Sequence, residues 1–284
     1  FIMRGRAQAA LVAILGIGSV WLAWLGIAAV ALVTLRRGSG EGIYLLLWAL
    51  LPAGVIAAVG NDIGPVGTLV TTVVMALVLR NTVSWPSTLL AGVVVAVLFG
   101  FALQVLGADY LAGLRALFDE LFTQMRSQLD DGQGALLKSP EVLQIAGLLG
   151  LSNLASSVAC LLLARWWQSL LYNPGGFRSE WLALRLSPVA VAALLGLAAV
   201  LIALGQPYRF WVLLPVVPLI LAGFALAHAV AARRGWGGGA LVLFYLVWLL
   251  VDWAKLALLV VAAADSWLDL RRRVKPRLNK ANKD

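Results

Sequence analysis

The sequence predicts an all-α, polytopic membrane protein with about eight hydrophobic segments. Of its 284 residues, 62% are hydrophobic and only 12% are charged, whereas about a quarter of the residues in a soluble domain are charged. The chain therefore has too little polar surface to cover a globule in water. The spans should be helices, because lipid offers no partner to an unpaired backbone amide. Several long stretches carry few or no charges, and some exceed the roughly 18 residues of a spanning helix. These stretches are 7–35, 43–59, 87–106, 142–164, 188–204, 210–232 and 240–264.

The distribution of charge predicts the orientation of the chain. The formal net charge is +9, and residues 271–284, behind the last hydrophobic segment, carry seven basic side chains. Six acidic and three basic side chains make the loop 107–141 net negative. Because lysine and arginine stay on the cytoplasmic side, we expect a basic cytoplasmic tail that meets anionic lipids, an extracytoplasmic loop at 107–141 and a cytoplasmic loop at 165–187. These assignments describe one transmembrane domain, 1–284, in a bacterial inner (plasma) membrane, with both termini cytoplasmic and no nucleic acid as a partner.

Both ends of the chain are expected to contain short or broken helices. If 7–35 were a single span, Arg4 and Arg6 would lie outside, against the positive-inside rule. A turn near residues 18–21 would return them to the cytoplasm. A turn near Asp252 would do the same for the basic tail, but 240–264 has no glycine or proline there, and a single long tilted helix is the alternative.

Both large loops predict amphipathic helices. The outer loop repeats apolar side chains such as Leu111, Leu114 and Phe118 at helical spacing, which predicts a helix at the outer interface or a lid over a cavity. In the inner loop, an aromatic belt precedes the turn sequence Asn-Pro-Gly-Gly at 173–176. The helix expected after this turn either lies on the membrane as an anchor or couples to a partner subunit. Its partner-binding candidates are Phe177, Arg178, Trp181 and Arg185.

The inner loop, together with an aspartate followed by tryptophan and a basic cluster at 265–273, resembles the YybS-like family of uncharacterised bacterial integral membrane proteins over most of the chain. That family is distantly similar to the substrate-binding (S) components of energy-coupling-factor vitamin transporters and to the rod-shape protein MreD. The resemblance implies an S-component-like fold. In those components, small residues spaced by four on the first helix dock the coupling subunit. Ala9 and Ala13 match this pattern, whereas Ile17 departs from it.

Polar side chains within or between the hydrophobic segments are the candidates for substrate binding, because an ion at the centre of a bilayer costs at least about 2.5–3.5 kcal/mol. Each has a plainer interpretation: a self-neutralised pair for Asp252 and Lys255, a turn for Asn61 and Asp62, and close helix packing for the serines. The last interpretation also applies to the glycines at 92, 100, 147 and 150. The candidates are Asn61, Asp62, Ser152, Asn153, Ser156, Asp252 and Lys255.

Several chemistries are not expected. Cys160 and His228 are the only cysteine and histidine, so a clustered metal site is not expected. His-Glu-x-x-His, Gly-x-Ser-x-Gly and the nucleotide-binding Gly-x-x-x-x-Gly-Lys are absent. We therefore expect no enzyme, no catalytic residues, no metal and no cofactor, and any ATP-driven step would come from a partner.

Two functions remain open. The first is a small-molecule binding or transport subunit without its own ATPase, with a closed, partly polar pocket that faces outside under the loop helix, near Asn61, Asp62 and 152–157. The alternative is a non-transporting scaffold that recruits an envelope-synthesis or other membrane partner through its cytoplasmic amphipathic helix.

Overall fold

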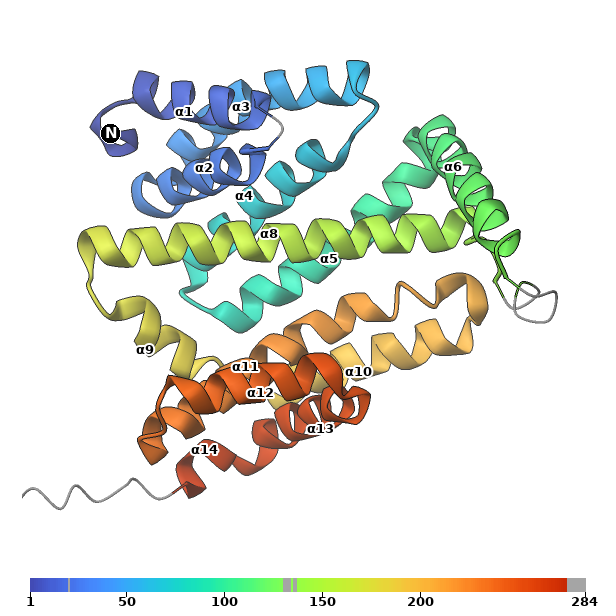
Figure 1. Cartoon of the computed structure of the whole chain (residues 1–284). Coiled ribbons are helices and arrows are strands. Elements are labelled where there is room, and N and C mark those ends of the chain that lie inside the picture. The colour runs from blue at the N-terminus through green and yellow to red at the C-terminus, as the bar shows by residue number, and fades with distance from the viewer. Residues whose placement is uncertain (20, 130–133, 135–136, 275–284) are drawn as a thin grey trace, which may run out of the picture. The chain divides into compact units, whose positions relative to one another are not determined.

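The computed structural model describes residues 1–19, 21–129, 134 and 137–274, and the part it describes is all-α, as the sequence predicts (Figure 1). The elements are η1 (Ile2–Arg4), α1 (Arg6–Gly18), α2 (Ala23–Arg37), α3 (Ser39–Val59), α4 (Gly64–Thr82), α5 (Trp85–Leu106), α6 (Ala108–Arg126), α8 (Val142–Tyr172), α9 (Gly176–Ala183), α10 (Pro188–Ala203), η2 (Gln206–Tyr208), α11 (Leu213–Arg234), α12 (Gly238–Leu250), α13 (Asp252–Leu268) and α14 (Leu270–Arg273).

The chain divides into two compact units. Unit 1 comprises Phe1–Gln168 and Ala198–Leu214, and unit 2 comprises Ser169–Leu197 and Pro215–Asp284. The boundaries fall inside α8, α10 and α11, so these three helices contribute residues to both units. Each unit is described by itself below. A single domain over the whole chain stays a prediction.

Several helices have the length and composition of membrane spans. Within the described residues, α3, α4, α5, α8 and α11 qualify alone, and the bent pairs α9 with α10 and α12 with α13 raise the number to as many as seven. Their apolar side chains face outward as well as inward: Leu47, Leu51 and Val55 on α3 are exposed. A helix that is apolar on all sides suits a lipid environment. The chain is therefore a multi-pass membrane protein.

The predicted turn in the N-terminal segment is confirmed. α1 ends at Gly18, α2 begins at Ala23, and the two helices pack against each other in unit 1. A Cβ atom added to Gly16 would lie 2.8 Å from the Cα of Gly26, so this crossing tolerates only glycine at that point. Ala9, Ala13 and Ile17 are buried in the unit's own core. The small residues that match the docking pattern of S components therefore serve internal packing here.

The glycine stripes on α5 and α8 also pack closely, as the plainer interpretation predicted. A Cβ on Gly150 would lie 3.1 Å from the carbonyl oxygen of Ala96, and a Cβ on Gly100 would lie 3.1 Å from that of Ala146. The ring of Trp211 covers Gly100 and contacts Gly147. Because glycine has no side chain, the backbones of α5 and α8 can approach each other closely and the ring of Trp211 can pack against both helices.

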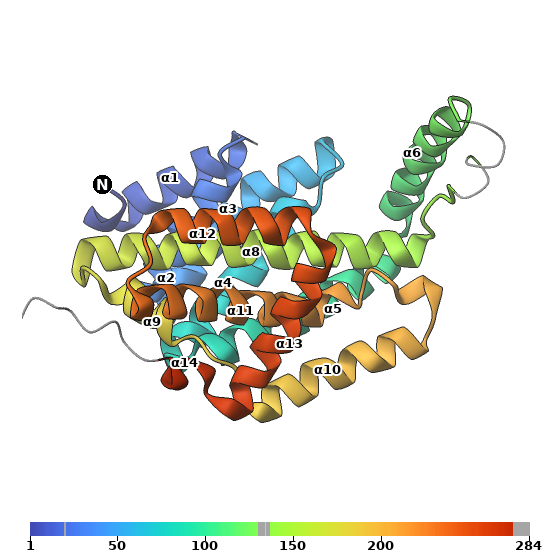
Figure 2. The ribbon, with the colours of Figure 1, turned by 60° about the horizontal axis from the view of Figure 1, so that its bottom comes forward.

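The C-terminal segment is broken next to Asp252, and a single long tilted helix is wrong. α12 and α13 meet at Val251, whose backbone is extended, and their axes are bent by 113°. Figure 2 shows α13 leaving the end of α12 at this sharp angle. The sequence lacks the usual glycine or proline there, so the break follows from the arrangement of unit 2 rather than from a local breaker.

Two boundaries around the inner loop differ from the prediction. α8 continues eight residues past Ala164 to Tyr172, because nothing between Arg165 and the Asn-Pro-Gly-Gly turn interrupts a helix, even though the hydropathy falls. The turn itself is confirmed: Gly175 has φ +87°, and the Ser169 hydroxyl donates to the carbonyl of Asn173 and accepts from the amide of Phe177. α9 then ends at Ala183, shortly before Pro188, which disfavours a helical residue before it.

Candidate functional site

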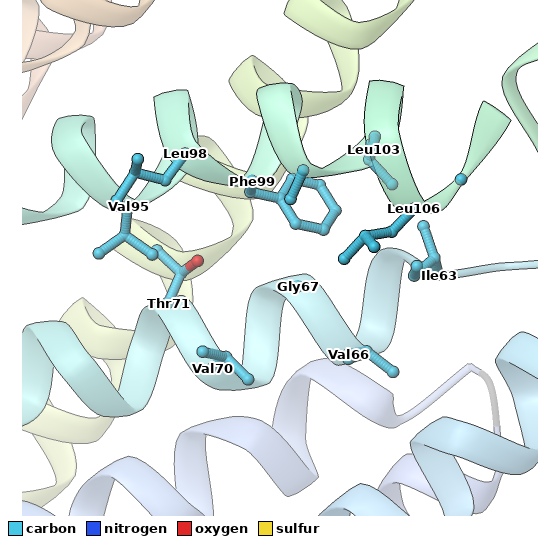
Figure 3. A pocket seen from close by; sticks show the side chains of 12 residues that line it. Ile63, Val66, Gly67, Val70, Thr71, Val95, Leu98, Phe99, Leu103 and Leu106 are labelled. Carbon is cyan, nitrogen blue, oxygen red and sulfur yellow. The ribbon is translucent and has the colours of Figure 1, made fainter.

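A half-open cavity of about 340 Å³ lies between α4 and α5 in unit 1, and its lining residues Leu98 and Leu106 are exposed (Figure 3). Its volume falls within the roughly 300–1,000 Å³ of typical ligand pockets. Ile63 and Leu106 lie at one end, and Val95 and Thr71 lie at the other. A Cβ on Gly67 would lie 2.5 Å from the Phe99 ring, so the glycine leaves room for that ring at the cavity wall.

The walls of this cavity are apolar except for the hydroxyl of Thr71. A partly polar pocket stays a prediction. The lining of this cavity differs from it in chemistry, although the cavity lies close to Asn61 and Asp62: Ile63, at one end of the cavity, follows Asp62 directly. The physical reason is that the polar side chains of α8 bond to α4 behind the wall instead of facing the space.

Asn153 is the only one of the α8 candidates that reaches the cavity wall. Its side chain is 3% exposed, and its Nδ2 donates to Thr71 Oγ1 at 2.9 Å. Ser157 Oγ donates to the carbonyl of Thr68 at 3.3 Å and strengthens the same α4–α8 contact. Asn153 Oδ1 finds no hydrogen-bond partner among the described residues. Ser152 and Ser156 are exposed, so they do not join this cluster.

Asn61 and Asp62 form the turn between α3 and α4, as the plainer interpretation predicted. Asn61 has φ +50°, and Asp62 Oδ1 accepts a hydrogen bond from the amide of Gly64 at 2.9 Å, at the start of α4. The carboxylate also acts on α6: the pKa of Tyr110 is raised from its ordinary value, mainly by burial and further by the charge of Asp62. The amphipathic helix α6 therefore begins beside the α3–α4 turn.

This proximity gives a spectroscopic prediction. Asp62→Asn should lower the pKa of Tyr110, because the repulsion of the phenolate disappears, yet the pKa should stay above its ordinary value because burial is the larger cause. An alkaline ultraviolet titration, with the spectrum of Tyr110→Phe subtracted, measures this ionisation. Asp119→Asn is the matched control, since Asp119 lies on the same helix beside Arg115, and it should leave the pKa unchanged. An unchanged titration in Asp62→Asn would contradict the assigned contact.

Asp252 and Lys255 form a pair in unit 2. Lys255 Nζ lies 2.7 Å from Asp252 Oδ1, three residues apart in the first turn of α13, and the Asp252 side chain is 91% exposed. This is the self-neutralised pair that the plainer interpretation predicted. Neither Asp62 nor Asn153 lines the α4–α5 cavity: Asp62 precedes the lining residue Ile63, and Asn153 bonds to the lining residue Thr71. Asp252 and Lys255 lie at the helix break.

A buried ion network in unit 2 was missed by the sequence interpretation. Arg271 donates to Asp265 Oδ2 at 2.9 Å and to the backbone carbonyls of Leu182 and Leu184 at 2.7 and 2.9 Å. Both charged side chains are almost fully buried. The left-handed residue Asp269, with φ +46°, ends α13 and turns the chain so that Arg271 points back. The aspartate and the basic cluster at 265–273 were visible in the sequence, but not this reversal.

The same network engages one of the partner-binding candidates. Arg185 forms an ion pair with Asp269 at 3.0 Å and donates to the carbonyl of Ser266 at 2.9 Å. Trp181 lies beside Phe177 on α9 and meets the ring of His228 edge to face at 6.3 Å. Arg178 is exposed. Two of the four candidates, Trp181 and Arg185, thus contact other parts of unit 2, and a partner on α9 stays a prediction.

No group of three or more His, Cys, Asp or Glu side chains that could hold a metal ion occurs within residues 1–19, 21–129, 134 and 137–274. Residues 275–284 of the predicted basic tail lie outside the described residues. Comparison with protein-family models, with curated proteins and with solved structures finds no match to this chain.

Proposed function

We propose that the chain is a small-molecule binding or transport subunit of a bacterial inner membrane, without an ATPase of its own, and that its ligand is apolar. The observation that carries this proposal is the α4–α5 cavity, whose walls offer one hydroxyl and otherwise only hydrocarbon. Such walls bind apolar groups by excluding water and would leave the polar groups of a vitamin-like solute unsatisfied. The ligand therefore differs from the vitamins that S components bind.

The position of the cavity also supports binding from the outer side. With both termini in the cytoplasm, the α3–α4 turn is extracytoplasmic, and Ile63 and Gly107 at the cavity border lie beside this turn and the start of α6. α6 has one buried apolar residue, Leu111, whereas Leu117, Leu121 and Met125 are exposed. A helix of this kind lies at a membrane interface. A ligand that partitions into the outer leaflet could reach the cavity beneath it.

The scaffold alternative has less support. Arg185 and Trp181 contact other parts of unit 2, so a partner would have to displace these contacts or use Phe177 and Arg178. The resemblance to the YybS-like family favours a substrate-binding role through its distant similarity to S components.

A cavity-filling variant tests the proposal. Ala102 lines the cavity, whereas Val105 lies on the same helix, is 80% exposed and does not line it. Ala102→Phe places a ring in the cavity, and Val105→Phe places the same ring on the outer surface. The purified full-length chain in lipid nanodiscs is photolabelled with trifluoromethyl-phenyldiazirine, and modified residues are located by mass spectrometry.

We expect labelling of the cavity walls, at Val66 and Phe99, that is reduced about tenfold in Ala102→Phe, as for a loss of about 1.4 kcal/mol in binding. Val105→Phe should label like the unmodified chain. Uniform labelling of all lipid-facing residues in all three proteins would overturn the proposal.

A further inference from the structure

Unit 2 contains a second apolar cavity, of about 390 Å³, between α11, α12 and α13. Ala227 and Val230 line it from α11, Ala240 and Phe244 from α12, and Ala257 and Val261 from α13. A neighbouring hollow on α12 shares Trp236, Ala240 and Phe244 with it. The small alanine side chains leave this space open, and its apolar lining from three helices suits a hydrocarbon chain.

The border of this cavity is basic. The guanidinium of Arg234 lies 5.8 Å from the centre of the Trp236 ring, and Arg272 and Arg273 stand between the lining residues Leu270 and Val274. A cation–π contact at this distance does not use the N–H groups of the guanidinium, which stay available for a phosphate. Tryptophan beside arginine is also typical of headgroup depth.

The acidic groups nearby do not cancel this charge. Asp265 is paired with Arg271, and Asp269 is shared by Arg185 and Arg272. Arg234 and Arg273 form no ion pair with any residue in the part of the chain that the structure describes. An occupant with a hydrocarbon chain and a negatively charged head is therefore complementary to the cavity and its border.

We infer that this cavity is a binding site for an anionic phospholipid, with an acyl chain along Ala240 and Phe244 and the phosphate at Arg234 and Arg273. Two other occupants fit less well. Residues 275–284 contain one large apolar side chain, Leu278, which is too little to fill the space. A cationic amphipathic helix would be repelled by the arginines at the border of the cavity. The inferred site lies in the other unit from the proposed ligand cavity and does not depend on it.

The test compares headgroups and variants on the delipidated full-length chain. Native mass spectrometry counts bound phosphatidylglycerol and phosphatidylcholine at equal acyl composition. The double variant Arg234→Gln and Arg273→Gln removes the charges, with Arg115→Gln on α6 as its control. Ala240→Phe fills the cavity, and Val242→Phe, on the same helix but outside both hollows and exposed, is its control.

We expect tighter binding of phosphatidylglycerol than of phosphatidylcholine, and a loss of about fivefold for each arginine removed, as for roughly 1 kcal/mol per basic residue near a lipid headgroup. Ala240→Phe should weaken both lipids, whereas the two controls and Ala102→Phe should bind normally. Equal binding of the two lipids would overturn the inference. So would a charge effect with no effect of Ala240→Phe, because the lipid would then lie on a basic surface outside the cavity. Circular dichroism confirms that each variant is folded before it is scored.

Discussion

Arg271→Met should lower the free energy of unfolding by about 3–5 kcal/mol, the usual cost of removing one partner of a buried ion pair. The methionine leaves the carboxylate of Asp265 buried without its counter-ion, and the carbonyls of Leu182 and Leu184 lose their donor. The segment after α9 and the end of α13 would then no longer be joined through the side chain of residue 271. Thermal or denaturant unfolding of the purified protein in lipid nanodiscs measures the change.

The neighbouring arginine is the matched control. Arg272 pairs with Asp269 at a similar distance, but its side chain is 83% exposed, so Arg272→Met should cost less than about 1 kcal/mol. Adding Asp265→Leu to Arg271→Met should recover part of the loss, because the uncompensated charge is then removed. Equal losses from Arg271→Met and Arg272→Met would show that burial of the pair has no energetic role.

Trp211→Ala should destabilise unit 1 by about 3 kcal/mol, which is the lower end of the range for removing a buried tryptophan. The lower end is expected because lipid rather than water surrounds the spans, so the loss comes mainly from missing packing contacts. Trp211 is fully buried, contacts Gly100 and Gly147, and its Nε1 donates to the carbonyl of Leu143 at 2.7 Å. The same unfolding measurements apply.

Two variants separate packing from hydrogen bonding at this position. Trp211→Phe keeps an aromatic ring but not the donor, so its effect should lie between those of the unmodified chain and Trp211→Ala. Trp253→Ala removes a tryptophan that is 78% exposed and should have little effect. If Trp253→Ala lowered the free energy of unfolding as much as Trp211→Ala, the packing role assigned to Trp211 would be contradicted.

Features that depend on sequence spacing and charge were predicted correctly. The hairpin of α1 and α2 followed from the charges at Arg4 and Arg6, which demanded a turn, and the close packing of α5 and α8 followed from their glycines. The turn at Gly175 was encoded by the local chemistry of glycine and proline. The turn at Gly175 lies within its own signal, whereas α5 and α8 are far apart in the sequence and their contact was indicated by the small residues that each helix carries.

The hydrogen-bond partners of polar side chains in distant segments were not predicted. Asn153 was recognised as polar, but only the packing of α8 on α4 shows that its amide bonds to Thr71 behind the cavity wall. Likewise, Arg271 was assigned to a basic tail, because nothing in its neighbours reveals that Asp269 turns it towards Leu182 and Leu184. The apolar character of the cavity follows from the same kind of contact.

The break at Val251 has a consequence for the bilayer itself. α12 has 13 residues, so it is about 20 Å long at 1.5 Å per residue, which is shorter than the roughly 30 Å hydrocarbon core. The last carbonyls of α12 and the first amides of α13 lack helical partners, and the Asp252–Lys255 pair stands beside them. These groups require water or lipid headgroups. The membrane next to the break should therefore be locally thinned and hydrated, so the protein changes the structure of the bilayer around it.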